Sequence, residues 1–310
     1  MRRAAWIVTT ATVALTACGI APASHQLNAA ARTPPASRPA AAPRPTAAPA
    51  STPASTVAPA VVAAADATAP PRLPHSPGGG PGRFRRTASG VLDGKVVLVD
   101  PGHNGGNFDA APVINQLIWN GRESETCDTT GTETDSGYTE AQFNWNVARY
   151  LTADLRAAGA TVVLTRTSNT GVGPCVTKRA ALGNQAHASA AVSIHADGGP
   201  PGGRGFAILE PVADGINNAI IGPSARLGTD LRNAFAAGTG EPVSSYDGVD
   251  GIQPRDDLAG VNLSTVPKVF IECANMRNAT DAALLTDPTW RQDAAVGLAR
   301  GLSQFLIGYP

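Results

Sequence analysis

A run of four apolar residues ends abruptly on a loop that carries a histidine. Residues 96–99 are Val-Val-Leu-Val, and Asp100, Pro101, Gly102 and His103 follow directly. Four consecutive apolar residues, three of them β-branched, predict a strand that is buried on both faces, as in an α/β sheet. The Asp-Pro-Gly sequence then predicts the end of the strand, because proline cannot donate to a ladder and glycine favours a turn. His103 is therefore expected at the carboxyl end of a central strand, where open α/β sheets bind their ligands.

The same pattern occurs a second time, farther along the chain. Residues 190–194 form another apolar run, which ends directly on His195 and a Gly-rich loop. Parallel strands place their carboxyl ends at one edge of a sheet, so both histidines are expected at that edge. Helical spacing of apolar residues predicts a helix over residues 139–158, with Glu140 in its first turn. Glu140 either meets a cation or is a first-turn residue that the helix dipole favours.

These side chains together make a candidate metal site. Two histidines and one carboxylate, with a fourth position open to water, are typical ligands of catalytic zinc. We therefore predict that His103, Glu140 and His195 bind Zn²⁺. Glu272 lies inside another predicted strand, over residues 266–273, and is available as the general base of such a site. The sequence contains neither a His-Glu-x-x-His nor a Gly-x-Ser-x-Gly motif, which argues against a thermolysin-type peptidase and a serine hydrolase.

The N-terminal segment has the pattern of an export signal. Arg2 and Arg3 precede an apolar run that is too short to span a membrane. The run ends in a sequence that resembles a bacterial lipobox at Cys18. We predict a lipoprotein-type signal over residues 1–23, cleaved before Cys18, which then carries the lipid anchor on the outer face of the cytoplasmic membrane. Ordinary cleavage after Ala23, which would release a secreted protein, is the alternative.

Composition divides the rest of the chain in two. Residues 24–88 are rich in Ala and Pro and have no apolar periodicity, which predicts a disordered linker. Residues 89–310 are long enough to form one catalytic domain. The sequence has 24 basic and 24 acidic residues, and this balance argues against a nucleic-acid-binding protein. We expect a monomer.

Cysteine usage predicts one disulfide. The sequence has four cysteines, of which Cys18 is assigned to lipidation and Cys273 lies in a predicted buried strand, as a free thiol. Cys127 and Cys175 both lie in polar loops of an exported chain, where disulfides can form. We predict that these two cysteines pair. Cys127 belongs to a long excursion over residues 109–138, in which Asn120-Gly121 predicts a hairpin that lines or gates the cleft.

Several separate motifs resemble zinc-dependent N-acetylmuramoyl-L-alanine amidases of the amidase 3 family, in particular its small actinobacterial members. The similarity runs from about residue 95 to residue 306, and its motifs include residues 99–103, 159–166, 193–197 and 266–272. It implies a single α/β domain with a mixed, mostly parallel sheet of about six strands, flanked by helices, with the zinc site at the carboxyl ends of strands. It also implies that zinc binds at His103, Glu140 and His195, and that Glu272 is the catalytic carboxylate.

The resemblance further implies a peptidoglycan hydrolase that acts on peptidoglycan or muropeptide fragments. The bond cleaved would be the amide between the lactyl group of N-acetylmuramic acid and the L-alanine of the stem peptide. Two alternatives are a non-enzymatic wall-binding lipoprotein on the same fold and a zinc peptidase that cuts within stem peptides. The sequence departs from the family at Asp197, where asparagine is usual, and at residues 273–276. Candidates for orienting the ligands or contacting substrate are Asp100, Asn104, Arg166, Asp197 and Asn278.

Overall fold

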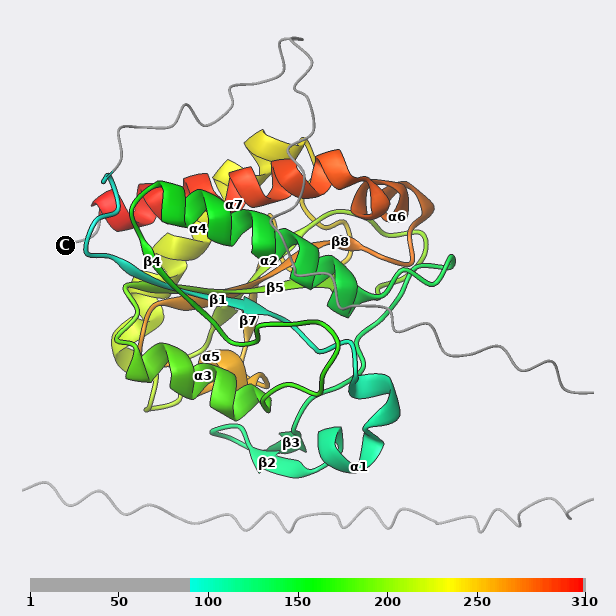
Figure 1. Ribbon diagram of the computed structural model, residues 1–310, viewed down its shortest axis with the longest axis horizontal. Helices are drawn as coiled ribbons and strands as arrows, with labels where there is room; N and C mark the ends of the chain where they lie inside the picture. Colours follow the sequence, from blue (N-terminus) through cyan, green and yellow to red (C-terminus); the bar gives the residue numbers. More distant parts are fainter. Residues whose placement is uncertain (1–89, 309–310) are drawn as a thin grey trace, which may run out of the picture. The chain divides into compact units, whose positions relative to one another are not determined.

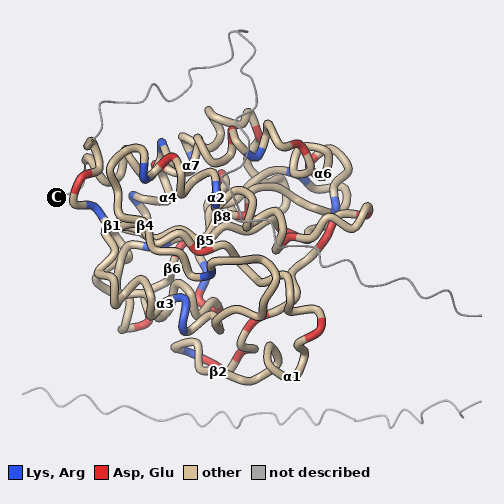
Figure 2. Tube along the Cα trace, viewed as in Figure 1, with Lys and Arg blue, Asp and Glu red and all other residues tan. Residues whose placement is uncertain are grey.

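The computed structural model describes residues 90–308 (Figure 1). The predicted export signal, the linker and the lipidation site Cys18 lie outside this range. Figure 2 shows Lys and Arg interspersed with Asp and Glu along the described chain. Among the helices of residues 90–308, none combines the length and the apolar character that a membrane crossing requires.

A mixed sheet of six strands forms the centre of the fold. Its strand order is β4-β1-β5-β8-β6-β7. The first four of these strands are parallel, β6 runs antiparallel to β8, and β7 is parallel to β6. This topology confirms the predicted mixed and mostly parallel α/β sheet. The strands are β1 (Val96–Pro101), β4 (Thr161–Leu164), β5 (Ala190–Asp197), β6 (Ala207–Pro211), β7 (Ile252–Arg255) and β8 (Lys268–Asn275).

Helices cover the two faces of the sheet unequally (Figure 1). Three long helices cover one face: α2 (Glu140–Ala157), α4 (Ile221–Thr239) and α7 (Pro288–Gly308). The shorter helices α3 (Val176–Gln185) and α5 (Ala259–Asn262) pack on the opposite face. α6 (Ala279–Thr286) packs beside α7, and the 3₁₀ turn η2 (Asn218–Ile220) leads into α4. The thinner layer leaves room for a cavity on that side.

The strands alternate between these two layers. In β1, Val97 and Val99 belong to the main core under α2, α4 and α7, whereas Leu98 belongs to the smaller core on the opposite face. In β8, Ile271 faces the main core and Phe270 the other side. Since side chains on a strand alternate with a period of two, Asp100, His195 and Glu272 fall on the face covered by α3 and α5. The candidate site therefore lies on the thinly covered face.

The helix that carries Glu140 forms as predicted. Its apolar stripe of Phe143, Val147, Leu151 and Leu155 is fully buried. The Thr139 side chain caps the helix by accepting a hydrogen bond from the backbone N–H of Gln142.

Three strand boundaries differ from the sequence-based expectation. β1 continues through Asp100 and Pro101, because both residues pair with β5 after β4 has ended at Leu164. β5 continues through His195 to Asp197, with a register shift between these two residues. β7 lies in a segment whose sequence has no alternating or continuous apolar strand pattern. Its sequence Ile-Gln-Pro-Arg contains a proline, which an edge strand tolerates.

The excursion before α2 contains the predicted hairpin. β2 (Leu117–Trp119) and β3 (Ser124–Thr126) pair antiparallel, after the short turns η1 (Asn107–Asp109) and α1 (Ala111–Ile114). Gly121 in the connecting loop has a φ of 107°, a conformation that favours glycine. Cys127, directly after β3, forms the expected disulfide with Cys175 at the start of α3, and Cys273 is a free buried thiol.

Candidate metal centre and active site

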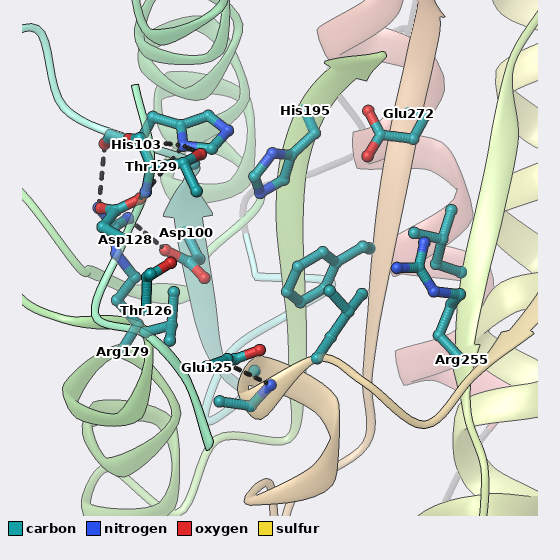
Figure 3. A pocket seen from close by; sticks show the side chains of 17 residues that line it. Asp100, His103, Glu125, Thr126, Asp128, Thr129, Arg179, His195, Arg255 and Glu272 are labelled. Carbon is teal, nitrogen blue, oxygen red and sulfur yellow. Dashed lines mark hydrogen bonds and ion pairs between the residues drawn. The ribbon is translucent and has the colours of Figure 1, made fainter. Parts of the chain in front are cut away.

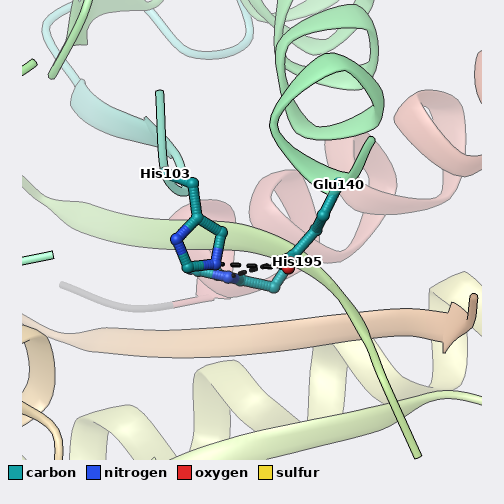
Figure 4. A group of neighbouring side chains, drawn as sticks. All are labelled: His103, Glu140 and His195. Atoms are coloured by element: carbon teal, nitrogen blue, oxygen red, sulfur yellow. Dashed lines mark hydrogen bonds and ion pairs between the residues drawn. The ribbon is translucent and has the colours of Figure 1, made fainter. Parts of the chain in front are cut away.

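Two histidines and a glutamate converge at the carboxyl edge of the sheet (Figure 4). His103 follows β1, His195 lies in β5, and Glu140 is the first residue of α2. One ligand atom of each residue lies within 4.8 Å of the others. Glu140 Oε2 is 3.2 Å from His103 Nε2, and Glu140 Oε1 is 2.8 Å from His195 Nδ1. Two imidazole nitrogens and a carboxylate aimed at a common point fit the ligand preferences of zinc.

The backbone around these ligands leaves no room for extra side chains. A Cβ at Gly102 would overlap the ring of His195, and a Cβ at Gly131 would meet both Glu140 and the His103 ring. Gly131 also has a φ of 73°. His103 itself adopts a φ of 55°, which is uncommon for a residue other than glycine and concentrates at functional sites.

Electrostatics at the three ligands favours a positive charge between them. Burial alone would lower the pKa of His103, but Glu140 and Asp128 outweigh burial and raise this pKa to about 10. Burial would raise the pKa of Glu140, yet His103 and His195 hold it well below its ordinary value. A carboxylate that is 4% exposed thus stays ionised between two imidazoles. A metal cation meets the same requirement, which supports the donor set as a metal site.

Asp128 is a functional candidate that the sequence reasoning missed. Its Oδ1 is 3.1 Å from His103 Nδ1 (Figure 3), whereas the other ring nitrogen, Nε2, faces Glu140. Its other oxygen accepts hydrogen bonds from Asn104 Nδ2 at 3.0 Å and from Arg179 at 3.2 Å. Its position beside a half-cystine was the available signal, because the predicted disulfide would hold this loop near the Arg179 helix.

Glu272 lies next to the candidate metal ligands, on β8, the strand that neighbours β5. It pairs in register with His195 across β5 and β8, so both side chains project from the same face (Figure 3). Its Oε2 is buried and accepts no hydrogen bond from any residue between 90 and 308. Burial and the carboxylates of Glu140 and Asp197 raise the pKa of Glu272 well above its ordinary value. A cation at the three-ligand site would oppose this shift and leave a carboxylate ready to take a proton.

A cavity of about 260 Å³ opens beside these residues. His103, His195 and Glu272 line one side of it, and Thr126 and Asp128 from the excursion line another (Figure 3). Phe270 forms part of the wall and stacks on the His195 ring, with centroids 5.2 Å apart and planes 3° from parallel. The cavity therefore gives a substrate access to the metal candidates and to Glu272 together.

Asp100 lies below the site, in a buried charge cluster. It accepts hydrogen bonds from Arg179 at 2.9 Å, Ser193 at 2.6 Å, Thr165 at 2.7 Å and Lys268 at 3.2 Å. Burial would raise its pKa, but Lys268 and Arg179 hold it far below the ordinary range. Asp100 thus anchors β1 to α3 and β8, and no histidine is among its hydrogen-bond partners in residues 90–308.

The other polar candidates from the sequence contact backbone carbonyls or other side chains. Asn104 supports Asp128, and Arg166 donates to the carbonyls of Pro101 and Gly102, which precede His103. Asp197 accepts a hydrogen bond from the Tyr246 hydroxyl at 2.8 Å. Asn278 caps α6 and donates to the Pro201 carbonyl. None of these four residues lines the cavity itself.

Comparisons with known proteins agree with this architecture. The N-acetylmuramoyl-L-alanine amidase family of the amidase 3 type matches residues 97–304. The N-acetylmuramoyl-L-alanine amidase Rv3717 of Mycobacterium tuberculosis is 41% identical over 216 residues, which are 69% of this chain and 88% of that protein. The crystal structure of the amidase Ami1 from Mycobacterium smegmatis has a TM-score of 0.66 at 41% identity and covers 69% of this chain and 98% of its own. That of Ami1 from Mycobacterium abscessus has a TM-score of 0.66 at 39% identity, with 69% and 100% covered. The chain therefore belongs to the N-acetylmuramoyl-L-alanine amidase family of peptidoglycan hydrolases.

Proposed function

We propose that the chain is a zinc-dependent amidase that separates stem peptides from the glycan of peptidoglycan. The bond cleaved joins the lactyl group of N-acetylmuramic acid to L-alanine. The observation that carries this proposal is the convergence of His103, Glu140 and His195 beside Glu272, whose Oε2 is buried and has no hydrogen-bond partner among the described residues, in a chain of this family. Zinc, when bound, supplies a Lewis acid that acidifies water and polarises a carbonyl.

In this proposal the protein side chains divide the work between holding the metal and moving protons. His103 Nε2, His195 Nδ1 and a Glu140 oxygen hold the ion. Glu272 takes a proton from the attacking water through its free oxygen and returns it to the leaving amine of L-alanine. Because no described residue donates a hydrogen bond to Oε2, this oxygen is free to act on water and substrate in the cavity.

The walls of the cavity suit an amide attached to a bulky sugar. Leu209, Leu258 and Phe270 provide apolar contact area, and Arg255 provides a cation at the rim. Arg255 forms a two-point ion pair with Asp257, which fixes the guanidinium in place. Such a surface can bind the apolar face of a sugar ring and a short peptide while the amide reaches Glu272.

An enzyme that acts on the cell wall is exported, and we extend this to its mode of attachment. The lipobox-like sequence at Cys18 supports a lipid anchor on the outer face of the membrane, with residues 24–88 as a tether to the catalytic domain from residue 89. Metabolic labelling with an alkyne-tagged fatty acid tests this directly. Label that is present in the wild type and lost in Cys18→Ala supports the anchor, and an unlabelled wild type refutes it.

Product analysis of digested peptidoglycan tests the activity. Purified protein with measured zinc content is incubated with sacculi, and the soluble products are identified by mass spectrometry. We expect stem peptides with a free L-alanine amine and glycan strands with intact lactyl carboxylates, and loss of both after zinc is removed by a chelator. Cleavage within stem peptides would identify a zinc peptidase, and no cleavage by the zinc-loaded protein would refute the enzymatic function.

A further inference from the structure

One short segment, residues 128–132, contacts two of the three candidate metal ligands. It directly follows Cys127, one of the two cysteines of the disulfide. Asp128 and Thr129 contact His103, with Asp128 Oδ1 3.1 Å and the Thr129 carbonyl 3.2 Å from Nδ1. Thr132 contacts Glu140, because its backbone N–H donates to Oε2 at 3.0 Å and its carbonyl accepts from the Glu140 N–H at 2.9 Å. Two of the three candidate ligands therefore form outer hydrogen bonds with the same five residues, and Glu140 also accepts from Asn144 and the Ala196 N–H.

Both ends of this segment are fixed. Cys127 is bonded to Cys175, and the Cys127 carbonyl also accepts a hydrogen bond from the Val176 N–H at 2.9 Å. At the other end, Thr132 forms two hydrogen bonds with Glu140, the first residue of α2. The disulfide thus attaches the segment to α3, the helix that contributes Arg179.

Asp128 is the central contact of the segment. It is 5% exposed and accepts hydrogen bonds from Arg179, Asn104 and the backbone N–H of Thr129. These donors hold Asp128 Oδ1 against His103 Nδ1. A proton on Nδ1 that is donated to Asp128 leaves the lone pair of Nε2 facing Glu140 and the metal position.

We propose that Asp128, presented by the Cys127–Cys175 disulfide, is the positioning residue that fixes the ring orientation and the tautomer of His103 for metal binding. This proposal rests on the zinc site of the proposed function and adds to it a structural role for the disulfide. Mutation of a carboxylate that hydrogen-bonds to a metal ligand typically lowers the metal affinity by about 10–100-fold.

Zinc affinity of Asp128→Asn, measured by competition with a chromophoric chelator, is the first test. The amide has the size of the carboxylate but a single acceptor oxygen, so it cannot accept from His103, Asn104 and Arg179 together. We expect the affinity for zinc to fall about 10–100-fold. Asp109→Asn is the matched control, because Asp109 is an exposed aspartate in the same excursion, and its affinity should stay within about twofold of wild type.

The disulfide is tested by the double variant Cys127→Ser/Cys175→Ser in the same assay. We expect weaker zinc binding in the double variant, since the segment then loses its attachment to α3. An affinity equal to wild type in the folded double variant would refute the role of the disulfide, and an unchanged affinity in folded Asp128→Asn would refute the role of Asp128.

NMR spectra of the wild-type protein test the role of Asp128 without any substitution. In ¹⁵N NMR spectra of the zinc-loaded wild type, His103 should bind zinc through Nε2 and show a slowly exchanging proton on Nδ1. Zinc on Nδ1, or no protected proton there, overturns the proposal. Zinc binding that depends on Asp128 without peptidoglycan cleavage would refute the proposed activity alone, whereas a wild type that binds no zinc refutes both.

Discussion

His195 and Glu272 are direct neighbours across the parallel strands β5 and β8. Because paired residues on adjacent strands project from the same face, this register places a candidate ligand and a candidate base side by side without help from a loop. Strands position side chains more rigidly than loops do, and catalysis requires such fixed geometry.

This division between ligand and base predicts different effects for two substitutions. Glu272→Ala should keep its zinc and lose at least about 10²-fold of its turnover on peptidoglycan, because the proton acceptor is gone but the three ligands remain. His103→Ala should lose zinc itself. Metal content by atomic emission and turnover on labelled sacculi are measured on the same samples, and wild-type turnover by Glu272→Ala would exclude Glu272 as the base.

Substitution of Gly102 tests how closely the backbone packs against the candidate ligand His195. A Cβ at this position would overlap the His195 ring, so Gly102→Ala must displace a candidate ligand. We expect zinc affinity to fall at least about 10-fold and the domain to lose about 1–3 kcal/mol of stability. Gly222→Ala, at the start of α4, is the control, because no heavy atom lies within 4 Å of its added Cβ. Equal zinc affinity in the two variants would contradict this reading of the site.

The sequence predicted the parts of the site that lie on regular elements. His103 and His195 were recognisable because each follows or ends an apolar strand, and Glu140 because a periodic helix begins with it. Asp128 was not recognisable in this way. It lies outside the regular elements, 25 residues after His103, and its position depends on a disulfide and on Arg179 from another element.

The same physical limit explains the fold errors. Residues 252–255 have no strand pattern of their own and become β7 by pairing with β6. β5 continues beyond its apolar run because β8 offers partners as far as Asn275. Local propensity predicts where strands begin, whereas tertiary pairing decides where these two strands occur or end.

The buried Lys268 predicts a large effect on stability. Its side chain is fully buried, and its ammonium lies 3.2 Å from Asp100. Lys268→Met should cost about 3 kcal/mol, because removing one partner leaves the buried Asp100 carboxylate less compensated. Lys178→Met replaces an exposed lysine on α3 and should change stability by less than about 0.5 kcal/mol. Urea denaturation measures both, and a cost below about 1 kcal/mol for Lys268→Met would mean that Arg179 alone compensates Asp100.

Glu210, which lies outside the metal site, is expected to make the stability of the domain depend on pH. Burial on β6 raises the pKa of Glu210 from 4.5 to about 7. Because the folded-state pKa is higher, the stability that this group contributes is fully present below about pH 4.5 and is lost as the pH rises through 7. Glu210→Gln cannot lose a proton, so it should be more stable than wild type at pH 8, by on the order of 1 kcal/mol after allowance for partial exposure, and the difference should shrink toward pH 5. Thermal denaturation of metal-free protein across this range tests the trend. A difference that is constant with pH would refute the assignment.

The β2–β3 hairpin predicts a substrate-dependent effect on turnover. Glu125 and Thr126 line the cavity, and the hairpin is attached to its opposite wall, because Glu125 accepts a hydrogen bond from the Ala259 N–H at 3.1 Å. Deletion of residues 113–120 removes β2, which pairs with the strand that carries Glu125, while the disulfide still holds Cys127. We expect kcat/KM on a soluble muropeptide to fall roughly 10-fold, because binding energy from this wall is lost. Leu117→Ala, which alters an exposed side chain of β2, should stay within about twofold. If the deletion variant has wild-type kinetics on both muropeptides and sacculi, the hairpin neither lines a productive cleft nor gates it.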